Sequence, residues 1–369
     1  MAKSKVFFTD MSVTMERPLL VKFLNLLKKS GMDAIDFKDK FVAIKTHFGE
    51  YGNLAALRPN YARVLCDYIK ELGGRPFLTD CNTLYVGGRK NALDHISTAE
   101  FNGYSVITTG VHVIIADGLK GSDEALVPVE GGVYVKEAKI GRAIMDADIV
   151  ISLSHFKGHE MAGMGGALKN LGMGSGSRAG KMEMHSSAKP QVEPSLCVGC
   201  RRCQKICAHG APTLEGKVMH IDHNKCVGCG RCVAVCPKDA IIADMNESSD
   251  VMNCKVAEYA KAVIDGRPNF HISLAIDITP TCDCHSDNPL PIVPNVGMFA
   301  SFDPVALDAA CADAVSAAPP IPGSALAESK IEGGDHFHKT YPETNWRAGV
   351  EHAEKIGIGT ADYELVTVK

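Results

Sequence analysis

The sequence lacks several features that would assign it to a familiar class. No uninterrupted apolar run approaches the ~18 residues that a membrane helix needs, and the start, MAKSKVFFTD, has neither the apolar stretch nor the cleavage site of a signal peptide. Positive charge is not in excess, because 39 Lys and Arg face 43 Asp and Glu, for a net charge of −4. Nucleic-acid binding depends on a basic face. We therefore expect a cytoplasmic protein with no nucleic-acid partner and no membrane insertion.

Two short nucleotide-binding motifs are also missing. The sequence has no Walker G-K-[ST], and no G-x-G-x-x-G directly follows a predicted strand. Flavin stays open as a cofactor, because it binds without a short fingerprint. Hydrophobic residues make up 46% and charged residues 22% of the chain. These values are close to globular averages, which excludes a disordered tail or a coiled coil.

Cysteine, in contrast, is abundant, with 14 residues. In a chain without an export signal, so many thiols indicate metal ligation or redox chemistry rather than disulfides. Eight of them form two runs with the spacing C-x2-C-x2-C-x3-C, and Pro237 follows the second run. The runs are Cys197, Cys200, Cys203 and Cys207, then Cys226, Cys229, Cys232 and Cys236. This spacing is typical of bacterial two-cluster ferredoxins.

We therefore expect two 4Fe-4S clusters with crossed ligands, since the fourth cysteine of each run reaches the other cluster in such ferredoxins. One cluster would be held by Cys197, Cys200, Cys203 and Cys236, and the other by Cys226, Cys229, Cys232 and Cys207. A pair of zinc sites is the alternative, because zinc also accepts four thiolates. Zinc motifs seldom carry four cysteines in one such run before a proline. Ala208 stands where ferredoxins usually have proline after the first run, but it is not a ligand position.

The cysteine runs lie inside the chain, at about residues 190–243, after a Gly-, Ser- and Met-rich stretch at 171–190 that looks like a connector. On both sides, short apolar runs alternate with amphipathic ones, which indicates βαβ crossovers and a largely parallel sheet. We expect an α/β host, as one large domain or two lobes, that carries an inserted α+β two-cluster ferredoxin-like domain. The three expected parts are residues 1–189, 190–243 and 244–369.

The expected elements of the host follow from these runs. Strands are predicted at VFFTD, FVAIKTHF, PFLTDC, YSVITT, VIIAD and DIVISLSHF, and after the insert at FHISLAIDI, NVGMFASF and YELVTV. Helices are predicted around residues 18–30, 59–72, 88–102 and 137–146, and at DPVALDAACADAV.

Polar side chains gather where the predicted strands end. In parallel sheets, ligands bind outside the carboxyl ends of the strands. The residues at those ends are Lys45 and His47, Asp80 and Cys81, His155, Lys157 and His159 at alternate positions, and Asp277, which shortly precedes Cys282 and Cys284. Taken alone, each of these residues is usually a solvated side chain at the end of a strand. Because several strands carry such residues to the same edge of the sheet, we expect one shared cleft.

Two further features have alternative readings. Seven glycines between 163 and 180, with Lys169 and Arg178, form either an anion cradle or a flexible hinge. The thiols of Cys282 and Cys284 are candidates for a speculative third metal site, together with His155 or His159. Three other cysteines, Cys66, Cys254 and Cys311, lie in helical patterns and are expected in the core.

Three stretches together resemble a known family: KTHFGE, then SHFKGHEMAGMGGALKNLGMG, then DITPTCDCH followed by NVGMFASFDPVALDAAC. They are similar to the uncharacterised iron–sulfur centre proteins that contain the domain of unknown function 362, and the resemblance covers nearly the whole chain. It implies an α/β host with a two-cluster ferredoxin insert, but no particular reaction. It adds weight to a single site made of His155, Lys157, His159, Lys169, Asn170, Asp277, Cys282 and Cys284.

Two functions of different classes are then expected. In the first, an oxidoreductase exchanges electrons with a soluble donor or acceptor protein and passes them through the clusters to a small substrate, for which an anion is one candidate, or to a further cofactor. Its candidate catalytic residues are His155, Lys157, His159, Lys45, His47 and Lys169. In the second, the protein is a non-enzymatic electron carrier or a metallocentre-assembly factor. The large host favours the enzyme, because a pure carrier would not need it.

Overall fold

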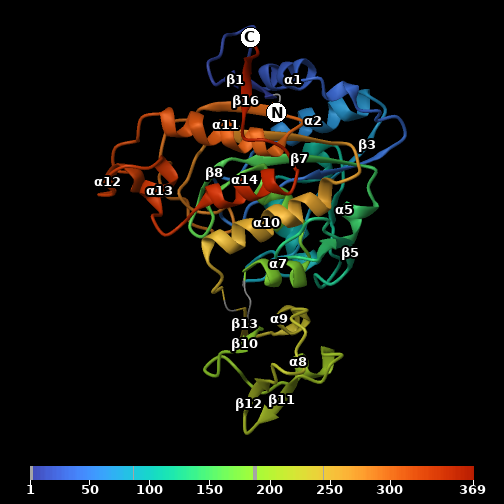
Figure 1. Cartoon of the computed structure of the whole chain (residues 1–369). Helices are drawn as coiled ribbons and strands as arrows, with labels where there is room; N and C mark the ends of the chain where they lie inside the picture. Colours follow the sequence, from blue (N-terminus) through green and yellow to red (C-terminus); the bar gives the residue numbers. More distant parts are fainter. Residues whose placement is uncertain (1–2, 86, 186–188, 244) are drawn as a thin grey trace.

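An eight-stranded sheet forms the centre of the molecule (Figure 1). The computed structural model describes residues 3–369 except 86, 186–188 and 244. The strand order is β16-β1-β15-β14-β7-β2-β3-β4, and β15 alone runs antiparallel to its neighbours. The strands are β1 (Ser4–Asp10), β2 (Phe41–Lys45), β3 (Arg75–Asp80), β4 (Val113–Ile115), β7 (Ile149–His155), β14 (Asn269–Ala275), β15 (Gly297–Ser301) and β16 (Tyr363–Thr367). The predicted α/β class with a large, mostly parallel sheet is confirmed.

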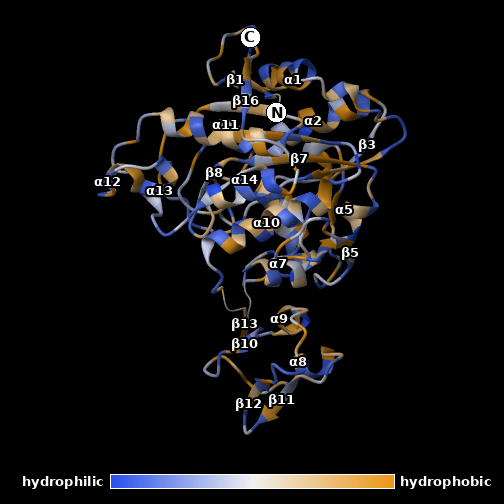
Figure 2. Cartoon of the chain, viewed as in Figure 1, coloured by the Kyte–Doolittle hydropathy of each residue, from blue (hydrophilic) through white to orange (hydrophobic). Residues whose placement is uncertain are grey.

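Helices cover both faces of this sheet, because its central strands are apolar on both sides. In β2, Val42 and Ile44 pack into the core on one face, and Ala43 packs into the core on the other. The first face is covered by α1 (Leu19–Lys29) and α2 (Pro59–Glu71), and the second by α6 (Ala167–Ser175), α10 (Ser249–Ile264), α11 (Pro304–Ala317) and α14 (Trp346–Lys355). Figure 2 shows both hydrophobic and hydrophilic residues along α10 and α14; α14 buries one side, whereas α10 is buried almost all round.

Shorter elements complete the part of the chain around the sheet. The hairpins are β5 (Glu124–Pro128) with β6 (Glu137–Gly141), and β8 (Lys157–His159) with β9 (Gly163–Gly165). The short helices are η1 (Met32–Ala34), α3 (Ala92–Phe101), α4 (Val106–Thr109), α5 (Arg142–Asp146), α7 (Arg178–His185), α12 (Ala325–Glu328) and α13 (His336–Thr340). Among the described residues, no helix is both long and apolar enough to cross a membrane.

Residues 190–243, called the cysteine-rich segment below, extend from one end of the molecule (Figure 1). The elements are β10 (Gln191–Val192), α8 (Arg202–Ile206), β11 (Pro212–Glu215), β12 (Val218–Ile221), α9 (Arg231–Val235) and β13 (Ile241–Ile242). The first and last strands, β10 and β13, pair antiparallel, so the two ends of the segment lie side by side. A small core of Met219, Ile221, Val233 and Ile241 also includes Leu84 and Met182 from outside the segment.

Three local predictions are wrong. The stretch YSVITT forms α4 rather than a strand, because Ser105 and Thr108 make a capping box that starts a helix. The predicted helix at 137–146 begins as strand β6, which pairs with β5, and becomes helical only at α5. Most of the predicted connector at 171–190 is buried in α6 and α7; its residues 186–188 lie outside the described residues.

Candidate functional site

A cavity of about 300 Å³ lies at the carboxyl ends of β2, β3, β7 and β14. Eight of the residues predicted to form the site line it: Lys45, His47, His155, Lys157, His159, Lys169, Cys282 and Cys284. Asp80, Cys81 and Asn170 line it as well. The parallel direction of these strands explains the convergence, since their carboxyl ends meet at one edge of the sheet.

The floor of the cavity is a buried ion pair between Lys45 and Asp80. The Lys45 ammonium lies 2.9 Å from the Asp80 carboxylate and donates to Asn170 Oδ1 at 2.8 Å. Burial lowers the pKa of Lys45, although the Asp80 charge opposes this shift. Burial acts in the opposite direction on Asp80, but the charge of Lys45, together with those of other nearby basic groups, outweighs burial and lowers the pKa of Asp80. Asn170 also donates to the carbonyl of Lys45 at 2.9 Å, which fixes α6 against the end of β2.

His155, at the end of β7, has both ring nitrogens engaged by oxygen atoms. Its Nδ1 lies 2.9 Å from an Asp283 carboxylate oxygen, and its Nε2 lies 2.7 Å from the carbonyl oxygen of Ile276. Burial of Asp283 is outweighed by the charges of His155 and Lys157, so the pKa of Asp283 is lowered. His155 therefore positions the loop after β14, and neither of its ring nitrogens is free for a metal.

Two lysines give the cavity positive charge. Lys157 is buried, and among the described residues its ammonium makes only a long contact of 3.4 Å with the carbonyl of Gly158. Burial opposes its charge, but the neighbouring Cys282, Asp283 and Cys284 outweigh burial and raise the pKa of Lys157. Lys169, on α6, forms no hydrogen bond or ion pair with any residue that the structure describes. The cavity can therefore offer two cations to an anionic group.

His159 is held as a neutral imidazole with a defined tautomer. Its Nδ1 accepts backbone N–H groups from Met161 and Ala162, both at 3.1 Å. A ring nitrogen that accepts a hydrogen bond carries no proton, so the proton of the neutral ring is on Nε2. Burial, followed by the charge of Lys169, lowers the pKa of His159.

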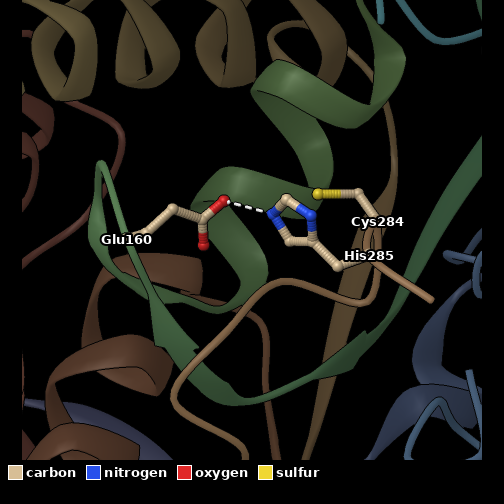
Figure 3. Close-up of side chains that lie close together, drawn as sticks. All are labelled: Glu160, Cys284 and His285. Atoms are coloured by element: carbon tan, nitrogen blue, oxygen red, sulfur yellow. Dashed lines mark hydrogen bonds and ion pairs between the residues drawn. The ribbon is translucent and has the colours of Figure 1, made fainter. Parts of the chain in front are cut away.

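The turn at 282–285 places the thiol of Cys284 and the imidazole of His285 beside Glu160 (Figure 3). The hydrogen bond between the two thiols lowers the pKa of Cys284 to about 7 and, together with burial, raises that of Cys282. His285 Nε2 lies 2.9 Å from Glu160 Oε1, and the backbone N–H of Cys282 donates to Glu160 Oε2 at 3.3 Å. The thiol of Cys284, the carboxylate of Glu160 and the imidazole of His285 thus come from two separate segments to one place.

Helix α7 contacts both the cavity and the loop of the second cysteine run, through neighbouring residues of one helix face. Lys181 and His185, one turn apart, line the cavity. Arg178 and Met182, also one turn apart, approach the loop that carries the second run, with Arg178 against Gly230 and Met182 near Gly228. The guanidinium of Arg178 also donates to the carbonyl of Thr83 at 3.0 Å, which ties α7 to the loop after β3.

The eight cysteines of the two runs lie in the cysteine-rich segment, and four of them share one small cavity. The four are Cys197, Cys200, Cys203 and Cys236, the same set that the crossed pattern assigns to one cluster. In the second run, Cys232 is mostly buried close to Cys229 and Cys226, and burial, with their charges, raises the pKa of Cys232 to about 12. Backbone N–H groups of Met219, Gly228 and Ala240 donate to sulfur atoms of Cys197, Cys226 and Cys236, at 3.2 to 3.4 Å.

Two sequence-based predictions about the site need correction. Asp277 does not line the cavity; its carboxylate pairs with Arg58 at 3.0 Å instead. The glycine-rich stretch does not form a hinge in its described residues, and the N-terminal N–H groups of α6 are already taken. Those of Ala167 and Leu168 donate to the buried carboxylate of Asp308 at 2.6 and 2.9 Å.

Sequence reasoning missed several residues of the cavity: Glu160, Arg89, Lys181 and His185. Arg89 is fully buried and reaches Glu50 at 3.2 Å, but it lies in a loop with no recognisable motif. Glu160 directly follows the HFKGH motif, and this position was a usable signal. Lys181 and His185 have the four-residue spacing of one helix face, which was hidden because the stretch was predicted to be a connector.

Comparisons with known proteins identify a family but no activity. The chain is similar to the solved lactate racemase apoprotein from Thermoanaerobacterium thermosaccharolyticum, with a TM-score of 0.38 and 11% identity over 74% of this chain and 51% of that one. A solved protein from Thermotoga maritima gives a TM-score of 0.37 and 14% identity over 71% and 50%. The chain thus spans about half the length of each, and no curated protein matches it. A family model described as domain of unknown function DUF362 matches residues 42–313, well over half of the chain. The chain therefore belongs to the DUF362 family.

Proposed function

We propose that the protein is an iron–sulfur oxidoreductase in which electrons pass from two 4Fe-4S clusters in the cysteine-rich segment to a small anionic substrate in the sheet-edge cavity. The observation that carries this proposal is the placement of α7. Its residues Arg178 and Met182 contact the loop of the second cysteine run, and its residues Lys181 and His185 line the cavity. A redox centre and a substrate site would then lie next to each other, in contact with neighbouring residues of one helix face.

The cysteine-rich segment suits the clusters in two respects. Cys197, Cys200, Cys203 and Cys236 line a single small cavity although Cys236 belongs to the other run, which supports crossed ligation in a ferredoxin-like unit. Backbone N–H groups also point at three of the sulfur atoms, as is common where thiolates carry the charge of a cluster. When bound, such clusters would supply electrons one at a time at low potential.

The cavity supplies binding and proton handling. Lys157 and Lys169 would hold a carboxylate or phosphate group of the substrate, since neither has an ion-pair partner within the described residues. His159 would present its Nε2 proton to a reduced product, because its Nδ1 is held as an acceptor by two backbone N–H groups. The Lys45–Asp80 pair would keep the floor rigid.

The cluster assignment is tested by anaerobic reconstitution followed by electron paramagnetic resonance of the reduced protein. The wild type should bind about eight irons and about eight sulfides per chain. Cys207 lies in the first run but is assigned to the second cluster, so Cys207→Ser should produce the spectral loss seen in Cys229→Ser, not that seen in Cys200→Ser. Cys254→Ser, a thiol on α10 outside both runs, should leave the spectrum unchanged. A Cys207→Ser spectrum that matches Cys200→Ser, or zinc in place of iron, would contradict the assignment.

A role as a metallocentre-assembly factor is the second candidate, and the grouping of Glu160, Cys284 and His285 favours it. The two roles differ in what the protein transfers: electrons to a small molecule, or a metal ion to a partner protein. An oxidoreductase would reoxidise its reduced clusters when a small anionic acceptor is added, and Lys169→Ala would slow this step without loss of iron. An assembly factor would instead release a metal to a partner protein.

A further inference from the structure

We infer that Glu160, Cys284 and His285 form a binding site for one borderline divalent metal ion of the zinc type. One ligand atom from each residue lies within 4.8 Å of the others (Figure 3). This site is separate from the eight cysteines of the two runs, and the inference does not depend on the proposed redox function. It names a ligand set that differs from the thiol pair Cys282 and Cys284 expected from sequence.

The spacing of the three side chains is close to what a metal requires. With bonds of roughly 2.0 to 2.3 Å from zinc to oxygen, nitrogen and sulfur, the ligand atoms of a tetrahedral site lie about 3.4 Å apart. His285 Nε2 and Glu160 Oε1 are now 2.9 Å apart in a direct hydrogen bond. Replacement of this hydrogen bond by two bonds to a metal needs only a small movement of side chains.

The types of ligand select the class of metal. A thiolate disfavours magnesium and calcium, which prefer oxygen ligands alone. One thiolate, one imidazole and one carboxylate suit zinc and its first-row neighbours. Three protein ligands also leave a coordination position open, which is the arrangement of catalytic rather than structural zinc.

The backbone around the site is already held in place. The carboxylate of Glu160 is oriented through its second oxygen, which accepts the N–H of Cys282 at 3.3 Å. Asn53 Nδ2 donates to the carbonyl of His285 at 2.8 Å, and the N–H of Glu50 donates to the carbonyl of Asp283 at 2.8 Å. Supporting contacts of this kind orient metal ligands before the ion binds.

Gly158 allows the two segments to approach each other. A Cβ at this position would lie 2.6 Å from the carbonyl oxygen of Pro280, so no other residue fits without a shift of the backbone. The N–H of Gly158 also donates to the carbonyl of Thr279 at 2.9 Å. The strand that ends just before Glu160 is thereby fixed against the turn that carries Cys284 and His285.

The surroundings indicate what the open position would bind. Lys157 and Lys169 line the same cavity as the three ligands, and neither forms an ion pair with a described residue. A small organic anion could place one oxygen on the metal and its remaining charge near the two ammonium groups. We therefore assign the open position to a carboxylate or phosphate ligand.

The test measures zinc binding to the full, cluster-loaded chain by metal analysis and zinc-edge X-ray absorption, a signal that iron does not obscure. The wild type should retain one zinc per chain, with one sulfur ligand and light-atom ligands for the rest. Cys284→Ser and His285→Ala should each weaken binding at least about 100-fold, since even outer partners contribute 10- to 100-fold. Glu160→Gln should weaken it too, and it serves as the variant least prone to misfold because it preserves size.

The matched controls are Cys254→Ser and His338→Ala, which change a thiol and an exposed imidazole outside the cavity. Both should bind zinc as the wild type does. The inference fails if the wild type retains no zinc, if the three site variants bind zinc as tightly as the controls, or if the absorption spectrum shows zinc bound by four sulfurs. Iron and sulfide contents should be unchanged in all three site variants, so failure here is distinguishable from failure of the cluster assignment.

Discussion

Asp308 is a buried acid with a clear structural task. Asp308 lies on α11, and its carboxylate accepts hydrogen bonds from the first two backbone N–H groups of the neighbouring helix α6. Burial raises its pKa to about 7, although the two backbone donors favour the ionised form. The proton on this side chain therefore matters to stability near neutral pH.

The stability of the protein should fall as pH rises from about 4 to about 7 because of this group. In that range the native carboxyl holds a proton that the unfolded one has lost, so the free energy of unfolding falls by up to about 1.4 kcal/mol per pH unit. Asp308→Asn should remove this part of the pH dependence. Thermal unfolding midpoints at pH 5 and pH 7.5 measure the effect, and an equal drop in the variant would contradict it.

The positions of single site residues were predictable from sequence where those residues lie at the ends of buried strands. Lys45 and His155 end buried strands, and the rule for parallel sheets brings them together without knowledge of any loop. Asp277 and Glu160 show the limit of this reasoning. Both follow strands, but Asp277 turns to Arg58 outside the cavity, while Glu160 lines it. The direction of such side chains depends on loop backbone geometry that spacing does not encode.

At the scale of helices, glycine in α6 serves close packing rather than flexibility. Gly172 lies against α10, where a Cβ would collide with the carbonyl oxygen of Val256. Gly172→Ala should therefore reduce the free energy of unfolding by about 1 to 3 kcal/mol, despite the better helix propensity of alanine. Chemical unfolding followed by circular dichroism measures it.

Gly165→Ala is the matched control for this substitution. Its Cβ would meet only the side-chain ends of Lys157 and Lys169, each at 3.7 Å, which is ordinary contact. We expect a change within about 0.5 kcal/mol. Gly165 lies on β9, so equal effects of the two substitutions would show that the loss of a buried glycine as such, rather than the approach of α6 to α10, decides the outcome.

Elements were predictable where an apolar run was long enough to be buried on both sides. DIVISLSHF and FHISLAIDI became the adjacent central strands β7 and β14. YSVITT has the composition of a strand, but the capping box of Ser105 and Thr108 decided in favour of a helix. The prediction of a connector at the Gly-rich stretch was wrong for a different reason. The helices of this stretch depend on tertiary contacts that composition does not reveal.

At the scale of the whole molecule, the eight-stranded sheet takes no strand from residues 190–243. Replacement of these residues by a short Gly-Ser linker should leave a folded α/β protein. A short linker is chosen because Gln191 pairs with Ile242 in the β10–β13 ladder, near the two ends of the segment. Circular dichroism and analytical ultracentrifugation test this expectation.

The same deletion would expose Leu84 and Met182 to solvent, because both side chains pack in the small core of the cysteine-rich segment. A Met182→Lys version of the deleted protein is therefore the useful companion, since it reduces the apolar surface left exposed. If both versions are unfolded, the cysteine-rich segment is integral to the stability of the sheet. A well-folded product in either version supports a separable unit.

Helix α7 has a consequence for electron tunnelling under the proposed function. Arg178 and Met182 contact the second cysteine loop, Lys181 and His185 line the cavity, and these four positions share one face of α7. Tunnelling rates fall exponentially with distance, so the short separation between these neighbouring side chains would set the barrier between donor and acceptor. The rate of the internal step would then be built into the chain and would not vary with how an external electron donor docks.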